Sequence, residues 1–225
     1  MCGIVGLFLK NPALRAELGL HFATMLEAMS ERGPDSAGIA IYHDPVPEGR
    51  CKLTLYHPDS TYDWRALAAH FASALEAGAD VEIRANHAVL AVDGDETMVR
   101  AWLNVHRPDV RVIGYGRAME VYKDMGRPAE VVTKYRVAEM EGSHALGHTR
   151  MATESAATAE HSHPFTAAAD MCLVHNGSLS NHNRLRQSLR RHGMSFDTDN
   201  DTEVAARYFA YRLSQGASLA GALDA

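Results

Sequence analysis

Cys2 follows directly after Met1, a position at which one residue can hold both a thiol and a free amine. Removal of Met1 would expose the α-amino group of Cys2, whose ordinary pKa of about 7.7 to 8.0 suits a base at neutral pH. This amine could take the thiol proton, directly or through a water, and later protonate a leaving amine. The alternative is a small apolar residue that opens a core strand, so the choice depends on the rest of the chain.

Polar residues suited to binding charged groups lie in short motifs in the last third of the chain. Arg150 ends a Gly-His-Thr-Arg motif, and its planar guanidinium suits bidentate binding of a carboxylate, although a surface ion pair is the simpler use. Asn176-Gly177 is a strong turn signal that also offers an amide and a backbone N–H as donors. Asp201 could bind an ammonium group or merely cap a helix.

Five motifs occur in the order found in class II glutamine amidotransferases. They are Met1-Cys2-Gly3-Ile4-Val5-Gly6, Arg32-Gly33-Pro34-Asp35-Ser36-Ala37-Gly38, Gly147-His148-Thr149-Arg150, His175-Asn176-Gly177 and Asp201-Thr202-Glu203. The chain therefore resembles the glutaminase domains of glucosamine-phosphate synthase, the purine amidotransferase and glutamate synthase. Each motif alone is weak, but five in the correct order are not expected by chance. The resemblance covers residues 1–42 and about 143–215.

The resemblance implies an α+β fold, the four-layer αββα sandwich of N-terminal-nucleophile hydrolases, with the active site at one end of two antiparallel sheets. Residues 1–225 would then be one glutamine amidotransferase type 2 domain with a small α/β insertion at about 50–142. The family continues into further strands after the Asp-Thr-Glu helix, and we expect some of these C-terminal strands to be missing from this sequence.

The resemblance also implies the catalytic residues. Cys2 would attack the side-chain carbonyl of L-glutamine, and the Asn176 amide with the Gly177 backbone N–H would form the oxyanion hole. Attack would release ammonia and leave a γ-glutamyl thioester, which water hydrolyses to glutamate. This half-reaction needs no cofactor.

Four further residues are implied as substrate-binding residues. Arg150 would bind the α-carboxylate of glutamine and Asp201 its α-ammonium group. Arg32 would approach the cysteine or the carboxamide end of the substrate, and Thr153 lies in the substrate-binding segment that follows Arg150.

Two features differ from the compact members of the family. Met151 and Glu154 stand where the synthases of glucosamine metabolism have tryptophan and histidine, and residues 39–146 form a longer spacer between motifs. The spacer resembles the amidotransferase-like subunits of glutamate-synthase-type complexes, including the first subunit of N-methylglutamate synthase. We therefore expect a glutaminase subunit that supplies ammonia to synthase subunits of a hetero-oligomer, with any flavin or iron–sulfur cluster on those partners.

Other functions fit part of the pattern. The chain could be a non-catalytic regulatory or structural subunit that retains the fold, or a hydrolase of other amides with an N-terminal cysteine. Neither explains the set of polar motifs. Among the 13 histidines, a metal site is suggested by His144, His148, His161, His163 and His175. No cysteine or carboxylate pattern completes a known ligand set, so we expect no catalytic metal.

Hydrophobic periodicity predicts the elements that position these residues. Strands are predicted at 4–9, 36–42, 52–56, 81–92, 110–113, 131–137, 145–149 and 171–175. Helices are predicted at 18–29, 63–76, 96–106 and 183–192. A capping box of Asn200 and Glu203 is predicted to start a final helix.

The composition excludes two classes of partner. The chain has 225 residues, 46% of them hydrophobic, and a formal net charge of −6 without a basic run, so neither nucleic acid nor an anionic membrane is an expected partner. The apolar run at 4–9 is far shorter than the ~20 residues of a membrane span and lacks signal-peptide features. Cys2, Cys51 and Cys172 are too few and too widely spaced for a disulfide framework, so we expect a cytoplasmic protein.

Overall fold

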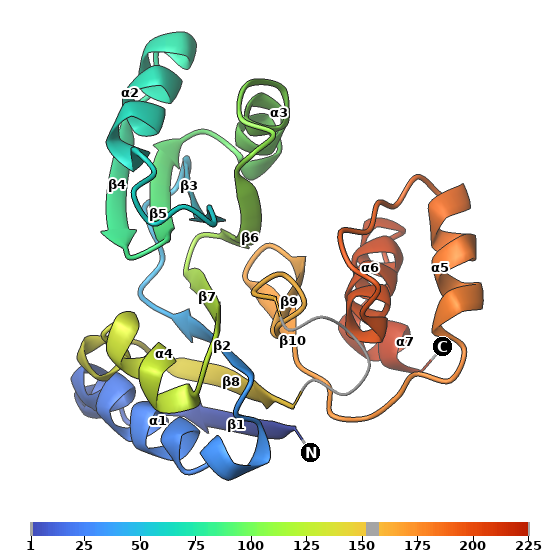
Figure 1. Cartoon of the computed structure of the whole chain (residues 1–225). Helices are drawn as coiled ribbons and strands as arrows, with labels where there is room; N and C mark the ends of the chain where they lie inside the picture. Colours follow the sequence, from blue (N-terminus) through green and yellow to red (C-terminus); the bar gives the residue numbers. More distant parts are fainter. Residues whose placement is uncertain (1, 152–157, 225) are drawn as a thin grey trace.

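The computed structural model describes residues 2–151 and 158–224 (Figure 1). Its first sheet has four antiparallel strands in the order β1 (Gly3–Phe8), β8 (His144–Arg150), β2 (Ser36–Tyr42) and β7 (Met119–Met125). Two helices, α1 (Leu18–Glu27) and α4 (Pro128–Lys134), cover one face of this sheet. Short 3-10 turns at Pro12–Glu17, Ser30–Arg32 and Val137–Glu139 complete this part of the chain.

Helix α1 is held to the sheet by an apolar stripe. Leu18, Phe22 and Leu26 recur at a spacing of four residues, lie on one side of the helix and are fully buried. A Cβ atom at Gly147 of β8 would lie 2.7 Å from the Phe22 ring, which is closer than side chains can approach. Glycine at position 147 therefore allows the helix to lie directly on the strand that carries Arg150.

A second, smaller sheet covers part of the opposite face. It is the antiparallel pair β9 (Phe165–Ala168) and β10 (Met171–Leu173), and its outer side packs on α6 (Asp201–Ser214). Helix α5 (His182–Arg191) packs on α6, and α7 (Leu219–Leu223) follows. The layers therefore run helix, sheet, sheet, helix, and the predicted α+β sandwich is confirmed. Within the described residues its second sheet has only two strands.

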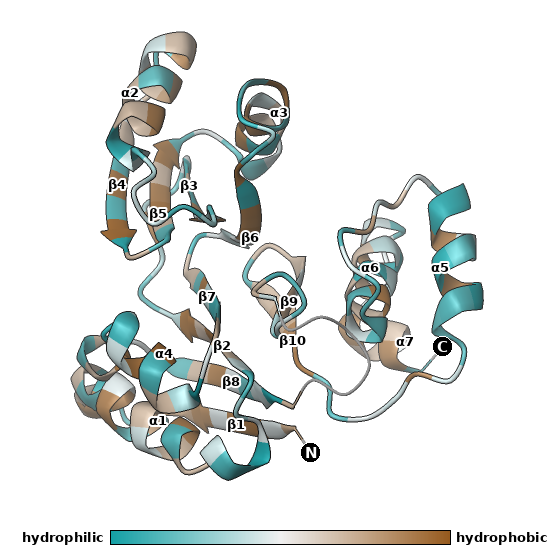
Figure 2. Ribbon diagram, in the orientation of Figure 1, coloured by the Kyte–Doolittle hydropathy of each residue, from teal (hydrophilic) through white to brown (hydrophobic). Residues whose placement is uncertain are grey.

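A third sheet builds a separate core. Its strands are antiparallel in the order β4 (Ala79–Arg84), β5 (His87–Asp93), β3 (Arg50–Tyr56) and β6 (Arg111–Gly116). Two helices, α2 (Trp64–Leu75) and α3 (Glu96–His106), pack on it through buried residues that include Trp64, Phe71 and Trp102. Figure 2 shows the hydrophobic strands β5 and β6 of this sheet, in contrast to the largely hydrophilic α5. The boundaries of an insertion at about 50–142 stay a prediction.

Most predicted elements are confirmed, and several differ. The strand predicted at 81–92 is the hairpin of β4 and β5, which turns at Ala85 with a positive φ of 54°. The strand predicted at 131–137 is wrong, because α4 forms there with Pro128 and Glu130 in its first turn. Strands β7 and β9 and helix α7 were not predicted. Among the described residues, no helix is long and apolar enough to cross a membrane.

Candidate active site

Cys2 lies at the edge of the first sheet, directly before β1. Its thiol is free and the residue is half-buried. In the register of β1 and β8, Gly3 lies opposite Thr149, so Cys2 comes opposite Arg150 when the register is continued by one residue. Gly3 itself packs so closely that an added Cβ would lie 2.8 Å from Thr149 Oγ1. The fold thus brings the N-terminal thiol beside the arginine of the Gly-His-Thr-Arg motif.

Arg150 is buried, with 6% of its surface exposed, at the end of β8 between β1 and β2. The Gly-Pro-Asp loop lies against its backbone, since Asp35 N donates to Arg150 O at 3.1 Å. A Cβ atom at Gly33 would lie 2.5 Å from Arg150 N, so this contact needs glycine. Its burial holds the guanidinium at the end of β8, at the same end of the sheet as Cys2.

Asn176 connects a distant segment to the N-terminus. It follows β10, and its side-chain Nδ2 donates a hydrogen bond of 3.0 Å to the backbone carbonyl oxygen of Cys2. An amide nitrogen carries two hydrogens, so one remains for another acceptor. Gly177 comes next, and both residues are exposed. The turn predicted to supply the oxyanion hole therefore lies against the predicted nucleophile.

Asp201 is the first residue of α6 and is tied to the same segment. Its Oδ2 accepts a hydrogen bond from Leu179 N at 2.7 Å and lies 3.9 Å from His175 Nδ1. Asn200 caps the helix by accepting from Thr202 N at 2.9 Å. Asp201 is therefore not needed to cap the helix, because Asn200 already does so.

The predicted capping box is wrong in its second half. Glu203 does not reach back to the cap residue, because its buried carboxylate accepts hydrogen bonds from Asp197 N, Thr198 N and Thr198 Oγ1. These bonds, each 2.7 to 2.8 Å long, fix the segment that leads into α6. Glu203 therefore fixes the segment 197–198 just before the helix that begins at Asp201.

Two buried histidines lie beneath Arg150 and were not recognised as part of the site. The rings of His148 and His163 stack with centroids 4.0 Å apart, and 1% and 5% of the two residues is exposed. Burial, together with the positive charge of Arg150, lowers the pKa of His148 to about 4 and that of His163 to about 2. Both rings are therefore neutral at pH 7. Strand alternation places His148 on the same face as Arg150, a signal that was present in the sequence.

Lys123 is a second group that the sequence did not place. It lies on the unpredicted strand β7, faces the second sheet and is buried with 5% exposed. Its Nζ lies 4.4 Å from the centroid of the Phe165 ring, a cation–π contact, and burial lowers its pKa to about 8.

The structure brings together most of the predicted site at one end of the sandwich. Cys2, Arg150, the Asn176-Gly177 turn and Asp201 come from separate segments that contact one another directly or through adjacent residues. Arg32 is exposed on its 3-10 turn, and its approach to the cysteine stays a prediction. Thr153 lies outside the described residues, and so does Glu154.

Metal ligation finds no support in residues 2–151 and 158–224, where no three His, Cys, Asp or Glu side chains gather in a way that could hold an ion. His148 and His163 stack on each other, and His161 Nδ1 makes a hydrogen bond with Thr158 Oγ1 at 2.7 Å. These histidines serve as packing and hydrogen-bonding groups.

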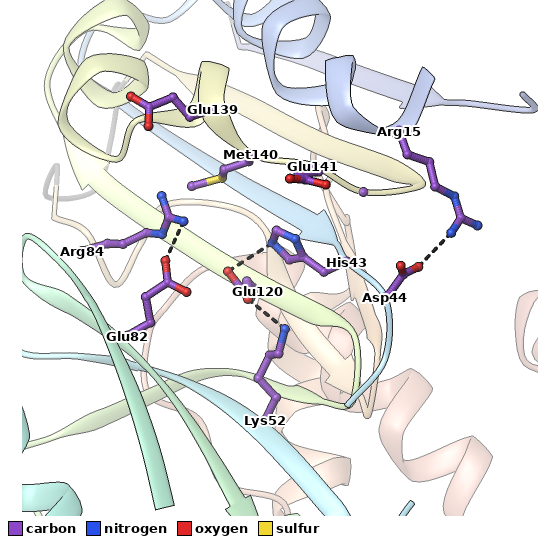
Figure 3. A pocket seen from close by; sticks show the side chains of 11 residues that line it. Arg15, His43, Asp44, Lys52, Glu82, Arg84, Glu120, Glu139, Met140 and Glu141 are labelled. Atoms are coloured by element: carbon purple, nitrogen blue, oxygen red, sulfur yellow. Dashed lines mark hydrogen bonds and ion pairs between the residues drawn. The ribbon is translucent and has the colours of Figure 1, made fainter. Parts of the chain in front are cut away.

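A polar cavity of about 460 Å³ lies elsewhere, between the first and third sheets (Figure 3). Glu120 lies in its wall and is bound by Lys52 Nζ at 2.8 Å, by Tyr122 Oη at 2.7 Å and by His43 Nε2 at 3.2 Å. Arg15 and Arg84 pair with Asp44 and Glu82 at its rim. The Lys52–Glu120 ion pair connects the third sheet to the first. None of the predicted site residues lines this cavity, so it is separate from Cys2.

Comparisons with known proteins agree with these motifs. A family model described as a glutamine amidotransferase domain matches residues 135–220. The chain is 49% identical to the glutamine amidotransferase-like protein GlxB of Rhizobium meliloti (strain 1021), over all of this chain and 75% of that protein. It is 32% identical to a putative glutamine amidotransferase of Methanothermobacter thermautotrophicus, over all of this chain and 76% of that protein.

Two more distant similarities cover larger enzymes in part. Glutamine–fructose-6-phosphate aminotransferase of Shewanella oneidensis is 33% identical over 45% of this chain and 17% of its own length. A solved structure of the allosteric regulatory enzyme of purine biosynthesis aligns with a TM-score of 0.46 at 18% identity, over 92% of this chain and 29% of that one. The two relatives that match over the whole of this chain, together with the order of the motifs, show that this chain belongs to the class II glutamine amidotransferase family.

Proposed function

We propose that the chain is a glutaminase subunit that hydrolyses L-glutamine to glutamate and ammonia with Cys2 as the nucleophile. The contact between Asn176 Nδ2 and the Cys2 carbonyl carries the proposal. It holds a side-chain donor of the oxyanion-hole type against the residue whose thiol would attack. Arg150, buried on the neighbouring strand, supplies the charge that an α-carboxylate requires.

The proposed reaction starts with the glutamine head group between Arg150 and Asp201. The free amine of Cys2 takes the thiol proton, and the thiolate attacks the side-chain amide carbon. The tetrahedral intermediate places its negative oxygen against the Asn176 amide and the Gly177 N–H. Collapse breaks the C–N bond, and the amine returns a proton to the leaving ammonia.

A γ-glutamyl thioester then remains on Cys2. Water adds to it with the α-amine as base, and the second tetrahedral intermediate expels the thiolate and gives glutamate. Loss of one oxyanion-hole donor typically lowers the rate by ~10²- to 10³-fold, so Asn176 is the residue whose removal most directly tests the geometry.

The ammonia is proposed to pass to synthase subunits of a hetero-oligomer, of the glutamate-synthase or N-methylglutamate-synthase type. Any flavin or iron–sulfur cluster would belong to those subunits. The third sheet supports this assignment, because it has a hydrophobic core of its own and carries none of the proposed site residues. We place the complex in the cytoplasm, and the three free cysteines support a reducing compartment.

The test is glutamine-dependent release of glutamate by the purified chain, alone and with its synthase subunits. Wild type should turn over, and Cys2→Ala should not. Cys51→Ala is the matched control, because it removes a buried thiol in the core of the third sheet and should leave turnover unchanged. A complete complex without turnover and with an unblocked Cys2 would favour the non-catalytic subunit instead.

A further inference from the structure

The hydroxyl of Thr202 lies between two histidines at the first turn of α6. His163 Nε2 is 2.7 Å from Thr202 Oγ1, and His175 Nδ1 is 3.4 Å from the same atom. Thr202 is fully buried. The hydroxyl is not needed to start the helix, since Asn200 binds the backbone N–H of Thr202 and not its side chain.

The direction of these hydrogen bonds follows from the protonation of His163. Burial keeps its ring neutral, so only one of its nitrogens carries a proton. Within the described part of the chain Nδ1 has no hydrogen-bond partner. An unpaired buried donor is costly, so the proton belongs on Nε2, which then donates to Thr202 Oγ1. The Thr202 hydrogen is thereby free for His175 Nδ1, or for Asp201 Oδ1 at 3.4 Å.

The start of α6 therefore holds both flanks of the Asn176-Gly177 turn. Thr202 contacts His175 on one side of the turn, and Asp201 binds Leu179 N at 2.7 Å on the other. The His175 ring also lies along the turn, since a Cβ atom at Gly177 would be 2.9 Å from its Nε2.

We infer that Thr202 is a positioning residue, and that the His163–Thr202–His175 relay fixes the Asn176-Gly177 turn against Cys2. The inference rests on the proposed glutaminase function. Asp201, proposed to bind the α-ammonium group, and Thr202, which holds the oxyanion-hole donors, are adjacent at the start of α6. Substrate and transition state are then aligned by the same rigid element.

Thr202→Val tests the relay because it removes the hydroxyl and keeps the shape. We expect kcat to fall by ~10- to 100-fold while KM for glutamine stays within about twofold, because the turn shifts and the head-group residues remain. Thr202→Ser keeps the hydroxyl and should restore most of kcat. Thr166→Val is the matched control, since the Thr166 hydroxyl donates to Ile113 O outside the relay.

A second readout does not depend on turnover. Nitrogen-15 NMR of the histidine rings should show His175 in the Nε2–H tautomer in wild type and a changed ring signal in Thr202→Val. Equal kcat in wild type and Thr202→Val, equal losses in Thr202→Val and Thr202→Ser, or an unchanged His175 signal would overturn the relay. The relay would be supported and the proposed function overturned by one combination of results. In it, the His175 tautomer is seen in wild type, its signal changes in Thr202→Val, and the wild-type complex has no glutaminase activity.

Discussion

Acid should destabilise the folded chain well above the pH at which carboxylates titrate, because three histidines are buried as neutral rings. His87, His148 and His163 are 0%, 1% and 5% exposed. Burial lowers their pKa values to about 3, 4 and 2. For His87 the hydrogen bonds also require a neutral ring, since Nε2 accepts from Lys123 N at 3.4 Å while Nδ1 lies 3.0 Å from Asn86 Oδ1.

The magnitude follows from proton linkage. The folded pKa of each ring is below its unfolded value of about 6.5, so the stabilisation is complete above about pH 6.5 and is lost as the pH falls toward the folded values. At pH 5 the unfolded chain binds about three more protons at these positions. Each ring then lowers the free energy of unfolding by about 2 kcal/mol, and the three together lower it by about 6 kcal/mol. A typical total stability is about 5 to 15 kcal/mol.

The assay is unfolding by guanidinium chloride, followed by far-UV circular dichroism at about pH 7, 6 and 5, with a single transition as the condition for a free energy. His87→Gln should reduce the loss between pH 7 and 5 by about a third. His21→Gln, at an exposed position, should not change it. A free energy of unfolding that stays within about 1 kcal/mol between pH 7 and 5 would show that the three rings are not buried as neutral groups.

Substitutions of Arg150, Asn176 and Glu120 test the substrate-binding residue, the oxyanion hole and the buried ion pair. Arg150→Lys should raise KM for glutamine by ~10- to 100-fold with a smaller effect on kcat, because an ammonium cannot bind a carboxylate in bidentate fashion. Steady-state glutamate release measures both constants, and an unchanged KM would contradict the prediction. Asn176→Ala should lower kcat by ~10²- to 10³-fold in the same assay, and a loss below about threefold would remove Asn176 from the oxyanion hole. Glu120→Gln should destabilise the fold by about 3 kcal/mol, because it leaves Lys52 buried without its charge partner, and the midpoint of unfolding should recover in Glu120→Gln/Lys52→Met.

The sequence was sufficient for elements whose signals are local. Strand β2 is a run of small and apolar residues between Pro34 and Pro45, and its predicted bounds of 36–42 agree with the structure. Strand β7 was missed because Glu120 and Lys123 interrupt its apolar character. Their partners, Lys52 and the Phe165 ring, are distant in sequence, so the burial of these charges had no local signal.

Helix α4 formed where a strand was predicted. Val131 and Val132 favour a strand by propensity, but Pro128 and Glu130 start a helix that buries both valines against the first sheet. Capping and tertiary packing outweighed the weaker β preference.

The candidate site was located by its motifs and not by its contacts. The five motifs predicted which residues gather, yet no pattern along the chain indicated that Thr202 meets His163, because 39 positions separate them. The histidines were considered as metal ligands, a reading that depends on spacing alone. Their stacking and burial could be known only from the fold.

The reactivity of Cys2 shows whether this residue is the glutaminase nucleophile. The complex with its synthase subunits would be treated with the glutamine analogue 6-diazo-5-oxo-norleucine, with and without excess glutamine, and digested for mass spectrometry. One adduct is expected, on an N-terminal Cys2 that has lost Met1. It should form more slowly when glutamine is present, and it should form equally in Cys51→Ala. An unblocked Cys2 that stays unmodified in the complete complex, or labelling at Cys172 in its place, would contradict it.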